Sequence, residues 1–241
     1  MKRVFLGMLT PSSNTVLEPV TQAMVSGLAE VSVHFSRFKV TEIALAPSAL
    51  AQFDDSEILR AAEMLAHTKA DVIAWNGTSS GWRGFEADHR LCDRITAATG
   101  IKSTTSMLAL NEILERSAVK RLGLVTPYLD DVQAKIVANY SALGVSCAAE
   151  RHLSMRDNFS FSEVPPDRIR AMIREVATAA PDAVAVVCTN LRGAPLVEQL
   201  EREIGMPIYD SISTVVWKSL LLADIEPKRV TGWGRLFREL G

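Results

Sequence analysis

Short apolar runs alternate with segments of helical periodicity along this chain. The runs RVFLGML, EVSVHFSRFKV and ADVIAWN predict strands, because they are short and rich in β-branched and aromatic residues. The segments NTVLEPVTQAMVSGL, DDSEILRAAEMLAHT, FEADHRLCDRITAATG and STTSMLALNEILERS carry apolar residues at helical spacing and predict helices. Strands that alternate with helices favour parallel sheets with helices on both faces, so we expect an α/β fold.

The same succession of segments occurs twice. LGMLTPSSNTVLEP resembles LGLVTPYLDDVQAK, and ADVIAWNGTS resembles PDAVAVVCTN. TGIKSTTSMLALNEIL and IGMPIYDSISTVVWKSLL form a third pair in the same order. We therefore predict an internal duplication with two pseudo-symmetric lobes, over residues 1–115 and 116–225, and a C-terminal segment, 226–241, that packs back on the first lobe.

Composition narrows the classes of function. With 241 residues, 48% of them hydrophobic, the chain can build a real core. The net charge of −2, without a basic stripe, disfavours a nucleic-acid partner. No apolar run approaches the roughly 18 residues of a membrane span, so no membrane partner is expected, and the sequence is compatible with a homo-oligomer.

Cysteine and histidine spacing argues against a metal site. The three cysteines form no CxxC pair, and the four histidines show no metal-ligand spacing. A phosphate loop and a dinucleotide fingerprint are both missing from the sequence. Free thiols fit a reducing compartment, and we expect a cytoplasmic protein.

Four polar loops follow predicted strands, with the sequences TPSSN, NGTSS, TPY and CTN. In open α/β sheets, ligands bind beyond the carboxyl ends of the strands. The four loops are therefore expected to face one cleft between the lobes.

Cys188 ends the apolar run DAVAVV and is followed at once by small polar residues. It is either a small core residue or a reactive thiol with its pKa lowered by a helix N-terminus behind it. The duplication places Gly77 opposite Cys188, so the thiol has no symmetric partner. Cys92 and Cys147 are interpreted as packing residues.

The segment WNGTSSGW offers the hydroxyls of Thr78 and Ser79 and several free amides after a strand. Such a loop can hold a carboxylate or an oxyanion, although a capped strand-to-helix turn has the same composition. The duplication places Thr189 and Asn190 opposite these two hydroxyl residues.

Two further residues are candidates for ligand binding. Asn14, in TPSSNT, either caps the next helix or donates its amide to a carboxylate. Tyr128 follows Pro127 at the matching place of the second lobe, where its phenol either packs or donates a hydrogen bond into the cleft.

Together these residues resemble the aspartate/glutamate racemase superfamily, in the branch of arylmalonate decarboxylase and maleate cis-trans isomerase. The resemblance runs from TPSSNT to GWGRLF. It implies two α/β lobes, a cleft thiol and no cofactor. Gly77-Thr78-Ser79 together with Cys188 is similar to the decarboxylase, which keeps only the second cysteine.

The resemblance also implies roles for single residues. The segment YLDDV is similar to a decarboxylase segment in which the tyrosine, here Tyr128, helps to form a dioxyanion hole. Ser12-Ser13-Asn14 is more similar to maleate isomerase, where the asparagine holds a substrate carboxylate. Asn158, in MRDNFS, matches an isomerase carboxylate ligand.

We therefore expect an enzyme that acts on a small carboxylic acid. The first expectation is a malonate-type decarboxylase, a lyase in which Cys188 protonates an enediolate. The alternatives are a maleate-type or racemase-like isomerase and, from a different class, a dicarboxylate-binding protein that has lost catalysis.

Overall fold

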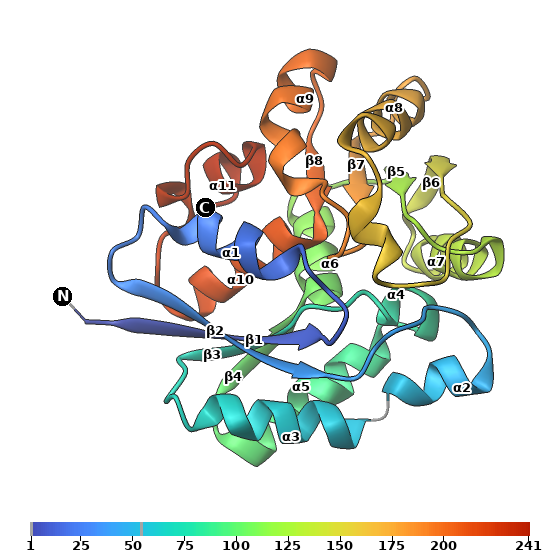
Figure 1. Ribbon diagram of the computed structural model, residues 1–241. Coiled ribbons are helices and arrows are strands. Elements are labelled where there is room, and N and C mark those ends of the chain that lie inside the picture. The colour runs from blue at the N-terminus through green and yellow to red at the C-terminus, as the bar shows by residue number, and fades with distance from the viewer. Residues whose placement is uncertain (1, 54) are drawn as a thin grey trace.

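The computed structural model describes residues 2–53 and 55–241 (Figure 1), so Met1 and Asp54, the latter in a predicted helix, lie outside the described residues. Two four-stranded parallel sheets form the frame, with strand orders β2-β1-β3-β4 and β6-β5-β7-β8. The strands are β1 (Val4–Pro11), β2 (Val31–Phe38), β3 (Val72–Trp75), β4 (Lys102–Thr105), β5 (Arg121–Val125), β6 (Ser146–Arg151), β7 (Ala183–Val186) and β8 (Ile208–Asp210). The identical strand orders confirm the predicted α/β fold with two pseudo-symmetric lobes.

The helices follow the strands in the same order in both halves. The α-helices are α1 (Leu17–Val25), α2 (Pro47–Leu50), α3 (Asp55–Ala66), α4 (Ser80–Arg83), α5 (Glu86–Thr99), α6 (Ser106–Arg116), α7 (Asp130–Ala142), α8 (Pro166–Ala177), α9 (Val197–Ile204), α10 (Ser211–Leu222) and α11 (Arg235–Glu239). Short 3-10 helices are η1 (Ala51–Phe53), η2 (Ser160–Glu163), η3 (Ala194–Leu196) and η4 (Pro227–Arg229).

The two lobes share one interface of packed helices. Helices α3 and α5 cover one face of the first sheet, and α1 and α10 lie on the other (Figure 1). Although α10 follows β8 in the chain, it contacts β3 and β4 of the first sheet and packs along α6. This crossing joins the lobes through buried apolar surface, which is the main favourable term in such packing.

The inner strands read as continuous apolar runs because they are buried on both faces. All residues of β3 and β7 are buried, whereas β2 and β6, at the sheet edges, are only partly covered. Both fully buried strands end at the interface between the lobes, which places the loops after Trp75 and Val186 there.

One predicted element is wrong in part. The segment STTSMLALNEILERS was expected to be helical throughout, but Lys102–Thr105 forms β4, and α6 starts at Ser106. The Thr105 hydroxyl caps this helix by accepting a hydrogen bond from the Leu108 N–H at 3.0 Å. β-branched threonines favour the strand, and pairing with β3 decides the outcome.

The C-terminal segment, which the sequence analysis placed on the first lobe, touches both lobes. Arg229 pairs with Glu30 of the first lobe. Arg238 pairs with Glu198 on α9, and the Arg235 N–H donates to the Glu201 carboxylate. The segment therefore also packs against the second lobe.

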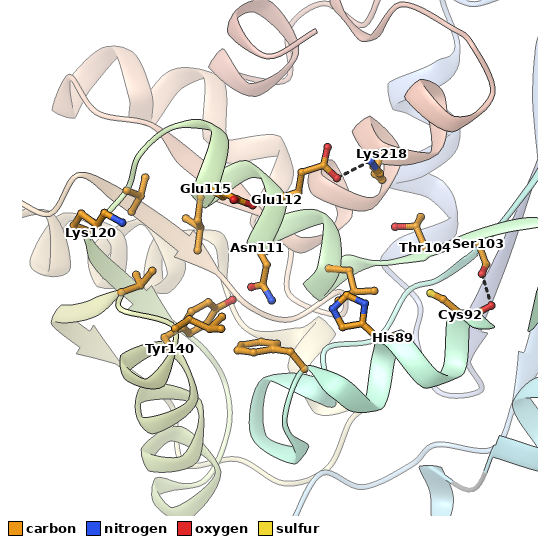
Figure 2. Close-up of a pocket in the computed structure, with 16 residues that line it drawn as sticks. His89, Cys92, Ser103, Thr104, Asn111, Glu112, Glu115, Lys120, Tyr140 and Lys218 are labelled. Atoms are coloured by element: carbon orange, nitrogen blue, oxygen red, sulfur yellow. Dashed lines mark hydrogen bonds and ion pairs between the residues drawn. The ribbon is translucent and has the colours of Figure 1, made fainter. Parts of the chain in front are cut away.

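A cavity of about 760 Å³ lies between α5, α6 and α7, on the side of β4 (Figure 2). Cys92, His89 and Tyr140 line it, and all three cysteines of the chain are free.

Among the described residues, no helix is long and apolar enough to cross a membrane, and no cluster of three or more His, Cys, Asp or Glu side chains could hold a metal ion.

Candidate active site

A small cavity lies where β1, β3, β5 and β7 end. Its volume is about 20 Å³, room for roughly one water molecule. Gly77 lines it together with polar residues from both lobes, which are Thr78, Ser79, Tyr128, Asn158, Cys188 and Thr189. The structure thus brings together most of the residues that the sequence analysis selected, whereas Asn14 and Asn190 lie one layer behind them.

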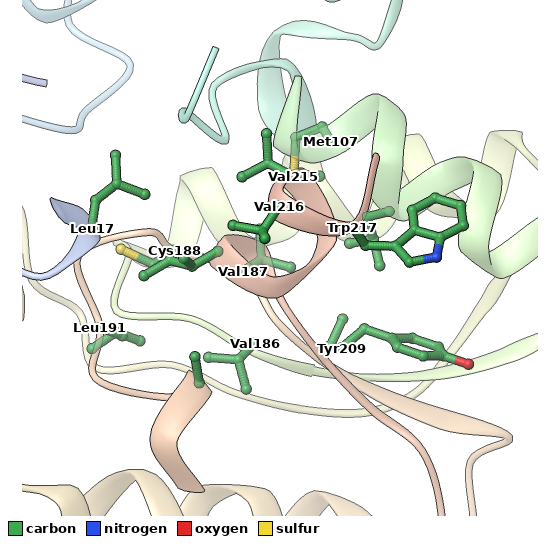
Figure 3. Close-up of a cluster of buried hydrophobic side chains, with 14 of the residues drawn as sticks. Leu17, Met107, Val186, Val187, Cys188, Leu191, Tyr209, Val215, Val216 and Trp217 are labelled. Atoms are coloured by element: carbon green, nitrogen blue, oxygen red, sulfur yellow. The ribbon is translucent and has the colours of Figure 1, made fainter. Parts of the chain in front are cut away.

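Cys188 lies two residues beyond β7, among the buried side chains of Leu17, Val187 and Leu191 (Figure 3). The N–H of Asn190 donates a hydrogen bond to its Sγ at 3.3 Å. Burial raises the pKa of the Cys188 thiol to about 12, because desolvation outweighs the hydrogen bonds from Asn190 and Tyr128 that favour the thiolate. The thiol is therefore protonated at neutral pH.

The prediction that a helix begins directly after Cys188 is wrong. The next regular element, η3, begins only at Ala194, and turns separate it from the cysteine. No helix dipole therefore points at the sulfur from directly behind it, and the expected lowering of the thiol pKa gives way to a rise.

Tyr128 and Thr78 connect the two lobes at the cavity. The Tyr128 Oη lies 2.6 Å from the Thr78 Oγ1, and the same phenol lines the cavity together with Cys188, where it lowers the pKa of the thiol. The rings of Trp82 and Phe161 hold the tyrosine from two sides, with centroids 5.2 and 5.7 Å away. Burial raises the pKa of Tyr128 well above its usual value, so the phenol keeps its proton and can donate it.

Asn14 links the first loop to the Cys188 loop. Its Nδ2 donates to the Thr189 Oγ1 at 3.1 Å, and this hydroxyl donates to the Asn76 carbonyl at 3.0 Å. Its Oδ1 accepts from the Leu17 N–H at the start of α1. In this structure Asn14 therefore caps the helix and orients Thr189, and both are buried.

Asn190 links the Cys188 loop to the start of α1 and to Asn158 through its side chain. Its Oδ1 accepts hydrogen bonds from the Thr15 and Val16 N–H groups, at 3.0 and 3.3 Å. Its Nδ2 donates to the Asn158 carbonyl at 2.6 Å. The Asn158 amide lines the cavity and donates to the Ser13 hydroxyl at 2.8 Å. Asn190 thus orients the cavity residue Asn158.

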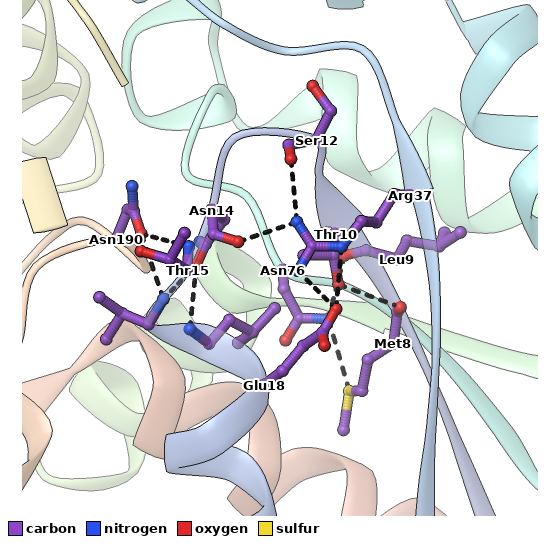
Figure 4. A network of polar contacts seen from close by, with 12 residues as sticks. Met8, Leu9, Thr10, Ser12, Asn14, Thr15, Glu18, Arg37, Asn76 and Asn190 are labelled. Atoms are coloured by element: carbon purple, nitrogen blue, oxygen red, sulfur yellow. Dashed lines mark hydrogen bonds and ion pairs between the residues drawn. The ribbon is translucent and has the colours of Figure 1, made fainter. Parts of the chain in front are cut away.

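Arg37, at the end of β2, holds the loop that carries Asn14 (Figure 4). Its Nη1 donates to the carbonyls of Ser12 and Asn14, both at 2.9 Å. Its Nε and Nη2 donate to the Glu18 carboxylate on α1, at 3.0 and 2.6 Å. The planar guanidinium therefore ties the loop to α1 through one rigid group.

Apolar side chains close the rest of the cavity. They are Pro11, Val40, Ile43, Phe53, Trp75 and Trp82. The sequence analysis missed them, although Trp75 and Trp82 flank the loop that it selected. The two tryptophans on either side of the selected loop are the sequence signal that could have found part of this wall.

Gly77 has no room for a side chain. A Cβ at this position would lie 1.9 Å from Cζ2 of Trp75, and 2.2 Å from its Cε2. The backbone of Gly77 does not have the positive φ that favours glycine. The indole of Trp75, and not the local backbone, excludes larger residues here.

Two similar α/β lobes share one cavity that is lined by a thiol, a phenol and hydroxyls. These features define the class of this protein, a two-lobed α/β protein with a cysteine in the cavity between its lobes. A family model described as arylmalonate decarboxylase matches residues 8–237, and the chain belongs to this family.

Proteins of known activity are similar over most of the chain. The maleate isomerase of Nocardia farcinica is 29% identical over 243 residues, which cover 97% of this chain and 95% of that protein. The arylmalonate decarboxylase of Bordetella bronchiseptica is 28% identical over 181 residues, which cover 74% and 75%. A solved structure of the Nocardia isomerase, with a covalently bound succinylcysteine intermediate, has a TM-score of 0.89 at 27% identity and covers 98% of each chain. The family thus contains enzymes named for maleate and for arylmalonate.

Proposed function

We propose that this protein is a decarboxylase of malonate-type dicarboxylic acids, in which Cys188 protonates the enediolate left by the loss of CO₂. The observation that carries the proposal is a single buried thiol, Cys188, that shares its cavity with the hydroxyls of Thr78, Ser79 and Tyr128, while a glycine, Gly77, stands at the matching place of the other lobe. A protonated thiol is suited to act as an acid, whereas a nucleophile has to be a thiolate.

In the proposed reaction, the bond between the α-carbon and one carboxyl group breaks, and CO₂ leaves. The electron pair stays on the remaining carboxylate as an enediolate. Cys188 then transfers its proton from Sγ to the α-carbon, and solvent reprotonates the thiolate. Every proton and electron pair is accounted for by these groups, so the reaction as proposed needs no cofactor.

Hydrogen-bond donors around the cavity stabilise the enediolate in this proposal. Thr78, Ser79 and Tyr128 line the cavity and carry hydroxyl groups that can turn to a bound oxyanion. A preorganised donor of this kind contributes about 3–4 kcal/mol to a transition state. The apolar walls favour loss of the other carboxylate as neutral CO₂, because a charged group is poorly solvated against them.

Substrate binding requires the cavity to widen, since about 20 Å³ is smaller than any malonate. Val40, Ile43 and Phe53 line it from the connection between β2 and α3. We infer that residues 39–53 of this connection move when substrate enters, as the loops over many active sites do.

A maleate-type isomerase is the second candidate. The similarity to a maleate isomerase covers 97% of the chain, and Asn158, which resembles an isomerase carboxylate ligand, lines the cavity. In that reaction a thiolate adds to the double bond, the single bond rotates, and the thiolate leaves again. The glycine at position 77 and the raised pKa of the Cys188 thiol make this reaction the less favoured one.

An activity screen distinguishes the candidates. The purified protein is incubated in D₂O with α-substituted malonates, with maleate and with amino acids, and the products are followed by NMR. Decarboxylation predicts CO₂ release and one deuterium at the α-carbon, in one enantiomer. Fumarate formed from maleate without CO₂ supports the isomerase, and thermal stabilisation by these acids without turnover supports a binding protein.

A further inference from the structure

We propose that Trp75 determines the substrate specificity of this site. Its indole takes the space opposite Cys188, so that the site accepts an α-carbon with a small alkyl substituent and offers a proton from one face only. The substrate part of this inference rests on the proposed function, whereas the packing part does not depend on it.

Trp75 and Gly77 compete for the same volume. A Cβ at residue 77 would lie 1.9, 2.2 and 2.6 Å from Cζ2, Cε2 and Cη2 of the indole. Non-bonded carbon atoms rest about 3.5–4.0 Å apart, so even an alanine requires the ring to move. The ring cannot move freely, because Trp75 is buried and packs on Phe38 with centroids 4.9 Å apart.

In the second lobe, the side-chain sizes at the two positions that match Trp75 and Gly77 are reversed. Trp75 ends β3 and pairs with Leu9 of β1, while Val186 ends β7 and pairs with Val125 of β5. Val186 therefore stands at the position of Trp75, and Cys188 at the position of Gly77. One lobe combines a large residue with glycine, and the other combines a smaller residue with the cysteine.

This exchange of volume has a chemical consequence. Trp75, Gly77 and Cys188 line the same cavity, so the indole forms an apolar wall where the first lobe has no thiol. The wall carries no acid that can exchange a proton on that face of the α-carbon. It also takes the room that a bulky α-substituent, such as an aryl ring, would need.

The packing part is tested by thermal unfolding of Gly77→Ala, Trp75→Leu and the double variant. We expect Gly77→Ala to lower Tm strongly in the native background and far less in the Trp75→Leu background. Gly27→Ala is the matched control, because a Cβ there meets no atom of residues 2–53 or 55–241 within 4 Å. Trp75→Val, which removes the whole ring and has the side chain that Val186 has at the matching position, replaces Trp75→Leu if the latter does not fold. An equal loss of Tm in both backgrounds, or a loss no larger than that of Gly27→Ala, overturns the inference.

The specificity part is tested by calorimetric binding of methylmalonate and phenylmalonate, with Cys188→Ala as the background so that nothing turns over. We expect Trp75→Leu to shift the ratio of the two Kd values at least tenfold toward phenylmalonate. An unchanged ratio overturns the assignment of Trp75. The absence of CO₂ release by the native protein instead counts against the proposed function and leaves this ratio measurable.

A second thiol provides an independent readout. Gly77→Cys combined with Trp75→Leu is expected to exchange the α-hydrogen of 2-methyl-substituted acids with solvent deuterium, whereas Gly77→Cys alone is not. Equal exchange by the single and double variants contradicts the proposed role of the indole.

Discussion

The Tyr128 hydroxyl lies 2.6 Å from the Thr78 hydroxyl, although the two residues belong to different lobes. Cys188 lines the same cavity, so a hydroxyl, a phenol and a thiol lie together at one site. Thr78 belongs to the first lobe, whereas Tyr128 and Cys188 both belong to the second, so neither lobe alone holds all three groups. The candidate site therefore exists only when both halves of the chain are folded together.

Removal of the Tyr128 hydroxyl tests its place in this connection. Tyr128→Phe is expected to lower kcat by about a hundredfold to a thousandfold with little change in KM, because the lost donor acts mainly on the developing charge. Tyr140→Phe is the control, since the buried Tyr140 hydroxyl has no hydrogen-bond partner among the described residues and Tyr140 lines a different cavity. Steady-state kinetics of both variants check this, and an unchanged kcat in Tyr128→Phe assigns the residue to packing.

The three cysteines are expected to react in an order that burial determines. Cys147 is half-buried, whereas Cys92 and Cys188 are more deeply covered and both have pKa values raised to about 12 by desolvation. Iodoacetamide at pH 8 should therefore label Cys147 first and Cys188 slowly, because the thiolate is the reactive form. Peptide mass spectrometry over time measures the order, and rapid labelling of Cys188 contradicts a buried, protonated thiol.

For catalysis, the order of the cysteines should be the reverse of their order of labelling, so that Cys188 matters most. Cys188→Ala is expected to reduce turnover by several orders of magnitude while circular dichroism stays native. Cys147→Ala, a substitution away from the cavity, should retain native kcat and KM. Near-native turnover by Cys188→Ala would remove the thiol from the proposed mechanism.

Arg37 is expected to affect substrate binding more than chemistry. Arg37→Met removes the bonds to the Ser12 and Asn14 carbonyls and the pair with Glu18, which loosens the loop that carries Asn14. We expect KM to rise several-fold, kcat to change less, and stability to fall by about 1 kcal/mol or less, since this pair is partly exposed.

Arg60→Met is the matched control for Arg37→Met, because Arg60 makes an exposed pair with Glu57 on α3. Kinetics and thermal unfolding of both variants give the comparison. An equal effect of the two substitutions on KM contradicts the positioning role of Arg37.

The pH dependence of stability depends on buried carboxyl groups. Burial raises the pKa of Asp210 to about 7 and that of Asp88 to about 6 in the native state. The native protein therefore binds more protons than the unfolded chain between about pH 4 and pH 7. This contribution to stability is complete below about pH 4 and is lost as the pH rises toward 7.

Asp210→Asn isolates one of these groups. The amide cannot ionise, and asparagine can still cap α10, where Asp210 accepts from the Ile212 N–H at 2.8 Å. We expect the loss of stability between pH 4.5 and pH 8 to become smaller by a few kcal/mol in the variant. Urea unfolding at several pH values measures the free energy of unfolding. If this free energy changes equally with pH in the native protein and in the variant, the pKa of Asp210 is not raised.

Local patterns were sufficient to predict the architecture. Strand and helix periodicity reflects burial of one face, and three matched segments in the same order predicted two equivalent sheets. Because parallel strands end at one edge of a sheet, the sequence also indicated which loops meet, and the cavity is lined by Thr78, Ser79, Tyr128 and Cys188. The strand β4 was missed, because its conformation depends on pairing with β3.

By itself, then, the amino-acid sequence determined the fold, the duplication and the loops that face the cavity, since these follow from residue type and spacing along the chain. Only the tertiary structure decided that the Cys188 thiol is protonated, that Tyr128 bridges to Thr78 and that the indole of Trp75 fills the side-chain space of Gly77. The physical reason is that desolvation and steric overlap depend on side-chain directions and on neighbours from distant segments. Spacing along the chain carries no information about either.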